Sequence, residues 1–150
     1  MYAVFSPLVA LGFSPGASRA QEPIAVVVNA SNPISSMTVE GLRRLYLGQS
    51  AALPNREPVI LLETALLRER FYGQALGMRV DQFKRHWISV LFAGEAFVPP
   101  RDPGSVDDLM QFVASHPGAI AFVALNRVAS SVKVIAIEGA RPGAPNYPLR

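Results

Sequence analysis

Residues 24–29 read Ile-Ala-Val-Val-Val-Asn, an apolar run rich in β-branched residues, which predicts a strand. Because polar residues do not alternate with apolar ones, the strand is expected to be buried on both faces of a sheet. The polar stretch that follows contains Asn32-Pro33 and predicts a turn. Thr38 is then a favourable N-cap for a helix, with Glu40 in its first turn and Gly48 as its stop signal.

The alternation of strand and helix continues along the chain. A second buried strand is predicted at 59–62, and further strands at 119–125 and 132–137. Helices are predicted from Thr64 to Gly77, from 80 to 92 and from Ser105 to 116. This order predicts an α/β fold, a three-layer sandwich with a mostly parallel sheet. Residues 21–138 are expected to form the domain, and residues 139–150, with three prolines, an extended C-terminal tail.

The first twenty residues differ in character from the rest. A short apolar run at 8–13 is followed by a Ser-Pro-Gly break and by Ala17-Ser18-Arg19-Ala20. This pattern predicts a signal peptide over residues 1–20, with cleavage after Ala20, and therefore a periplasmic protein. No Lys or Arg precedes the apolar run, so the signal is atypical. The alternatives are a true start upstream of Met1 and a loosely packed N-terminal segment.

Composition narrows the function classes. The chain has 150 residues, half of them hydrophobic, and a net charge of +3. Because acidic residues stand between the basic ones, the positive charge is not clustered, and a nucleic-acid partner is not expected. The absence of cysteine excludes disulfides and thiol nucleophiles. His86 and His116 lie far apart without acidic neighbours, which favours structural or surface roles. No phosphate-loop, dinucleotide or zinc motif is present, so we expect no enzyme, no metal and no cofactor.

Several segments, in this order, resemble the phosphate-binding proteins of ABC importers. Leu45-Tyr46-Leu47-Gly48 is similar to the family's Ile-Phe/Tyr-Leu-Gly-Lys, with Gln49 in place of the Lys. Arg68-x-x-Phe71 is similar to the start of the helix after the phosphate loop. Residues 113–123 are similar to Val-x-x-x-Pro-Gly-Ala-Ile-Gly-Tyr-Val. The ordered set covers residues 24–138. The resemblance implies one lobe of a type II periplasmic binding protein, a phosphate-like oxyanion as ligand and a membrane transporter as partner.

Two departures from the family qualify the expected function. The chain is long enough for only one of the two lobes that close on the ligand, and an exposed inter-lobe face is compatible with either a monomer or a homodimer that rebuilds a two-lobed cleft. The family's Asp-Gly-Ser-Gly-Thr-Arg loop falls on residues 63–68, where only Arg68 and, loosely, the acid Glu63 remain. Each lost hydroxyl donor contributes about 1.5–3 kcal/mol, against about 8 kcal/mol for a micromolar site. We therefore expect weak or altered anion binding through Thr64, Arg68 and Glu63.

Glu63 and the leucines near it each allow another interpretation. Glu63 follows a buried strand, where α/β proteins often place functional groups, but it is also compatible with a solvated loop acid near Arg68 or Arg70. Ala65, Leu66 and Leu67 make this part of the family loop hydrophobic, with Ala65 and Leu67 replacing its Ser and Thr. They are compatible with a contact patch for another exported or membrane protein, in a module that has lost ligand binding, or with helix core.

Overall fold

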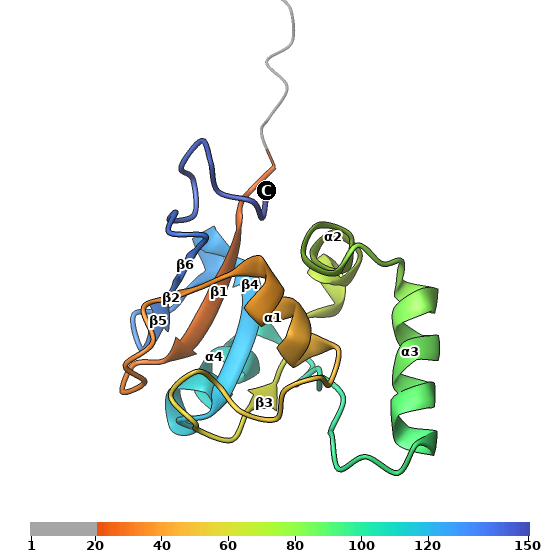
Figure 1. Cartoon of the computed structure of the whole chain (residues 1–150). Coiled ribbons are helices and arrows are strands. Elements are labelled where there is room, and N and C mark those ends of the chain that lie inside the picture. Colours follow the sequence, from red (N-terminus) through yellow and green to blue (C-terminus); the bar gives the residue numbers. More distant parts are fainter. Residues whose placement is uncertain (1–20) are drawn as a thin grey trace, which may run out of the picture.

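The computed structural model describes residues 21–150, so the predicted signal peptide lies outside the described residues. A central four-stranded sheet has the strand order β3-β4-β1-β5, and a second sheet pairs β2 with β6 (Figure 1). The strands are β1 (Ile24–Asn29), β2 (Ser36–Met37), β3 (Ile60–Leu61), β4 (Ala119–Ala124), β5 (Val132–Val134) and β6 (Ala136–Ile137).

Helices cover both faces of the central sheet, with α4 on one face and α1 and α2 on the other (Figure 1). Alternate residues of β1 divide between the two cores: Val26 and Val28 pack in the core that includes Phe71, and Val27 packs in the one that includes Leu109. The predicted three-layer α/β arrangement is therefore confirmed. The helices are α1 (Val39–Tyr46), α2 (Arg68–Phe71), α3 (Val80–Phe92) and α4 (Val106–Ser115), with the single turns η1 (Ala65–Leu67), η2 (Tyr72–Leu76) and η3 (Leu125–Arg127).

The central sheet is mixed rather than mostly parallel. Strand β3 runs parallel to β4, but β1 is antiparallel to both β4 and β5. A continuous apolar run predicts burial on both faces of a strand and carries no information on the direction of its neighbours. Since β4 lies between β3 and β1, the chain does not make the simple parallel crossover that the strand–helix order suggests.

The helix predicted from Thr64 to Gly77 is broken into three short pieces. It begins as the 3₁₀ turn η1, continues as four α-helical residues in α2, and widens into the π-helical turn η2. The Thr64 side chain makes no capping hydrogen bond. Asp102 acts as the cap instead, because its carboxylate accepts a hydrogen bond from the Ala65 N–H at 3.0 Å. Gly77 ends the segment with a φ of 64°.

Helix α3 is attached to the end of α1 through two ring nitrogens. The Trp87 indole N–H donates to the Tyr46 carbonyl at 3.0 Å, and His86 Nε2 lies 2.7 Å from the Leu47 carbonyl. Gly48 follows with a φ of 68°, and a Cβ there would lie 2.9 Å from the Trp87 ring. Glycine is therefore required where α1 ends, both for its backbone conformation and for its lack of a side chain.

The C-terminal residues lack regular structure, as an extended tail would, but they pack against the domain. Tyr147 and Leu149 are buried in the core with α1 and β1. The Ile24 N–H donates to the Leu149 carbonyl at 3.0 Å, and the Tyr147 hydroxyl donates to the Ile24 carbonyl at 2.6 Å. Packing of the domain thus continues beyond the expected boundary at residue 138, because the side chains of Tyr147 and Leu149 bury apolar surface.

No helix within residues 21–150 has the length and apolar character needed to cross a membrane.

Candidate functional site

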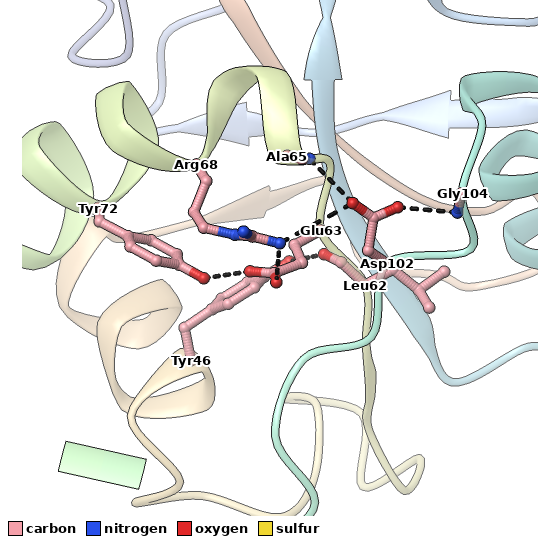
Figure 2. Close-up of polar contacts among 8 residues, drawn as sticks. All are labelled: Tyr46, Leu62, Glu63, Ala65, Arg68, Tyr72, Asp102 and Gly104. Atoms are coloured by element: carbon pink, nitrogen blue, oxygen red, sulfur yellow. Dashed lines mark hydrogen bonds and ion pairs between the residues drawn. The ribbon is translucent and has the colours of Figure 1, made fainter. Parts of the chain in front are cut away.

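A partly buried ion pair lies at the carboxyl end of β3. Glu63 follows the strand and is 8% exposed, and Arg68 begins α2. Arg68 Nη2 donates to Glu63 Oε1 at 2.7 Å, while the Tyr72 hydroxyl donates to Glu63 Oε2 (Figure 2). Arg68 and Tyr72 are four residues apart, which places both side chains on the same side of the helical segment. The carboxylate is thereby held between a guanidinium and a phenol.

The surrounding aromatic side chains hold this cluster in place. The Tyr46 hydroxyl donates to the Leu62 carbonyl at 2.8 Å and so ties α1 to the end of β3. The Tyr72 ring stacks on Phe83 with centroids 4.0 Å apart. Burial, the hydrogen bond to Glu63 and the charge of Glu63 all raise the pKa of Tyr72. Tyr72 therefore stays a neutral donor well into the alkaline range.

Asp102 supplies a second carboxylate to the site. It accepts the Ala65 N–H at 3.0 Å and the Gly104 N–H at 2.8 Å, and its Oδ2 lies 3.8 Å from Arg68 Nη2 (Figure 2). The first N–H of η1 is therefore already bonded to a carboxylate of the same chain and is not free for an external anion.

The charges at the site offset one another. Arg68 is positive and Glu63 and Asp102 are negative, so these three groups together carry a formal charge of −1. Desolvation acts to lower the pKa of Arg68, but the hydrogen bond and charge of Glu63 prevail and raise it, so the guanidinium stays charged. Its Nε is buried without a hydrogen-bond acceptor among residues 21–150. The site contains a cation, but its field is largely neutralised before any ligand arrives.

The structure brings the three predicted site residues together. Glu63 and Arg68 are in direct contact, and Thr64 lies between them in the chain, buried and without a side-chain cap. Glu63 is a loop acid beside Arg68, as the alternative interpretation held, but it is buried rather than solvated. Sequence analysis missed Tyr72 and Asp102. Tyr72 could have been found from its i, i+4 spacing to Arg68, but Asp102 follows an irregular proline-rich loop and no local pattern links it to the site.

A cavity of about 380 Å³ opens beside the ion pair. Its polar lining comes from Glu63, Arg68, Tyr72 and Lys84, and the remainder of the wall is apolar. Within residues 21–150, no group of three or more His, Asp or Glu side chains is placed to hold a metal ion. The apolar residues of the wall are Val80, Phe83, Trp87, Ile88, Leu91, Pro99 and Pro100.

Together, the three layers and the mixed central sheet define the class of the chain as α/β, with the Glu63–Arg68 ion pair at the carboxyl end of β3. Several solved structures are similar to this chain. An ABC-type phosphate transport receptor from Vibrio cholerae matches with a TM-score of 0.66 and 21% identity, over 85% of this chain and 53% of its own. PstS from Borrelia burgdorferi matches with a TM-score of 0.61 and 9% identity, over 81% of this chain and 49% of its own.

A structure from Clostridium perfringens, solved with bound phosphate, gives a TM-score of 0.64 and 15% identity over 81% of this chain and 47% of its own. This chain thus spans about half the length of the solved structures it matches, which confirms the predicted likeness to one lobe. No protein-family model matches the chain, and no match was found among curated proteins.

Proposed function

We propose that this domain is an exported, non-enzymatic lobe of the solute-binding type that contacts a small oxyanion such as phosphate weakly through Arg68. The position of the Arg68 guanidinium carries the proposal, since ligands of open α/β sheets bind at the carboxyl ends of strands. Glu63 accepts from Arg68 and holds the guanidinium in place, and Thr64 lies next to Glu63 in the chain. Support comes from the similar structures, which include a phosphate transport receptor and a protein with bound phosphate.

Binding is weak because the chain's own carboxylates compete for the same donors. Glu63 accepts from Arg68 Nη2, and Asp102 accepts the Ala65 N–H that would otherwise face the ligand. An oxyanion must therefore approach a cluster whose net charge is −1, and it gains few new hydrogen bonds. We expect a dissociation constant of about 1 mM or weaker, which corresponds to about 4 kcal/mol.

Calorimetry of the full chain with phosphate and with sulfate at low ionic strength tests the proposal. Arg68→Gln is expected to abolish the signal, while Arg43→Gln, at an exposed position on α1, is expected to leave it unchanged. Asp102→Asn removes one competing charge and is expected to tighten binding several-fold. Submicromolar binding by the unaltered chain would refute the competition argument, and equal binding by Arg68→Gln would refute the site.

The proposed partners follow from the same likeness. We place the protein in the periplasm, with an ABC-type membrane transporter as its partner and a second copy of the chain supplying the facing lobe. Support comes from the similarity to the Vibrio cholerae transport receptor and from the match to about half of its length. Sedimentation equilibrium with and without phosphate tests the dimer: a monomer under both conditions would exclude it.

A further inference from the structure

Part of the apolar face of α3 is not covered by the described chain. Phe83, Trp87, Ile88 and Leu91 recur at helical spacing along α3, and the first two are buried. Ile88 and Leu91 are 53% and 51% exposed. In Figure 1 the helix stands apart from the layers around the sheet, which explains why the sheet core does not reach these side chains.

The two exposed side chains line the cavity beside the ion pair. Ile88 and Leu91 form apolar wall together with Pro99 and Pro100, while Glu63 and Arg68 contribute the polar part. A volume of about 380 Å³ lies within the range of small-molecule sites, about 300–1,000 Å³. The proline rings have fixed backbone φ angles, so this part of the wall is formed before a ligand binds.

The cavity wall adds a second cation, Lys84, to the charged groups of the site. Arg68 and Lys84 are positive and Glu63 is negative, so the lining itself carries a formal charge of +1, and with Asp102, 3.8 Å from Arg68, the four groups sum to zero. No ion pair among residues 21–150 includes Lys84, which leaves its ammonium available to a ligand. Asp102 contacts Arg68 but does not line the cavity, and in Figure 2 it lies on the opposite side of Arg68 from Tyr72.

We propose that this cavity takes a small amphipathic anion, an apolar body that ends in a phosphate or carboxylate group. The proposal rests on the oxyanion contact at Arg68 and adds the apolar part of the ligand. The head group interacts with Arg68 and Lys84, and the body covers Ile88 and Leu91. A bare oxyanion leaves this apolar surface in water, whereas each methylene removed from water strengthens binding about fourfold.

Calorimetry of the full chain with octyl phosphate, inorganic phosphate and octanol separates the two parts of the ligand. All three are used at low ionic strength, with the octyl compounds below the concentrations at which they aggregate. Octyl phosphate is expected to bind roughly tenfold or more tightly than inorganic phosphate, which corresponds to burying about two methylenes. It is also expected to bind more tightly than octanol, which lacks the charge.

Matched variants locate the binding. Ile88→Ser and Leu91→Ser are expected to weaken octyl phosphate binding severalfold while leaving phosphate binding unchanged. Phe92→Ser is the control, because Phe92 is 87% exposed on the same helix and does not line the cavity. Lys84→Gln is expected to weaken binding of both anions, with the exposed neighbour Arg85→Gln as its control. All five side chains are exposed or line the surface cavity, and the melting temperature checks that each variant is folded.

Each outcome decides between the two proposals. If octyl phosphate binds no more tightly than phosphate, or if Phe92→Ser weakens it as much as Ile88→Ser, the amphipathic ligand is excluded and the oxyanion site stands. If octanol binds as tightly as octyl phosphate and inorganic phosphate gives no binding signal, the cavity binds only apolar groups. The anion contact at Arg68 is then absent, and both proposals are refuted.

Discussion

Neutralising Glu63 should destabilise the fold, because two donors depend on its carboxylate. In Glu63→Gln the side chain keeps its size, but one carboxylate oxygen is replaced by an NH2 group, so either Arg68 or Tyr72 loses its acceptor. A hydrogen bond to a charged group is worth about 1.5–3 kcal/mol, and an unsatisfied buried donor costs about 1–3 kcal/mol. Since the Arg68 side chain is 26% exposed, water replaces part of what is lost. We expect a loss of about 2 kcal/mol.

The loss can be measured by urea unfolding followed through the fluorescence of Trp87, the only tryptophan, which is 4% exposed. A change of about 2 kcal/mol lowers the melting temperature of a chain of this size by roughly 4–8 °C. Glu69→Gln is the control, because Glu69 is an exposed neighbour, and a change within about 0.5 kcal/mol is expected.

A double-mutant cycle with Tyr72→Phe isolates the contact itself. If the phenol and carboxylate act together, the two changes should fall short of additivity by about 0.5–3 kcal/mol. Equal stability of Glu63→Gln and Glu69→Gln would refute the view that this carboxylate organises the site.

Three further predictions concern the fold around the site. Gly48→Ala should destabilise the protein by about 1–3 kcal/mol in urea unfolding, because the added carbon would lie 2.9 Å from the Trp87 ring at a φ of 68°; an unchanged midpoint would contradict the close packing. Leu66→Asp should change stability by less than about 0.5 kcal/mol, since Leu66 is 88% exposed, and loss of a captured periplasmic protein in a pull-down would support the contact-patch interpretation. Alkaline titration at 295 nm should show delayed ionisation of the buried tyrosines. Burial raises the pKa of Tyr46, Tyr72 and Tyr147. The stability that the neutral phenols contribute is therefore present below about pH 10 and is lost as the pH rises through the folded-state pKa. Ionisation of all three near pH 10 in the folded protein would contradict this prediction.

Local patterns were sufficient for the elements that bury a clear face. The apolar run at β1, the Thr38 cap of α1 and the boundaries of α3 could all be predicted, because each depends on neighbouring residues. Thr38 Oγ1 accepts the Gly41 N–H at 2.9 Å, as its N-cap position predicts. Strand direction could not be predicted in this way, because burial on both faces is compatible with either direction.

Only the part of the candidate site that is formed by residues close in the sequence could be predicted. Glu63 and Arg68 lie five residues apart around a strand–helix junction, so chain order alone suggests their contact. Asp102 reaches the site because the loop after α3 returns along β3, where the Arg101 N–H donates to the Leu61 carbonyl at 3.0 Å. Such a return is a tertiary event, and nothing in the proline-rich sequence specifies where the loop meets the sheet.

The contact between Ile24 and Leu149 has an architectural consequence. The two polypeptide ends of the packed region emerge side by side at the same edge of β1. A unit with adjoining ends can be spliced into a host loop, or its ends can be joined and new ones opened elsewhere, without stretching the backbone. The adjoining ends therefore make this unit suited to insertion into a loop of another protein and to circular permutation.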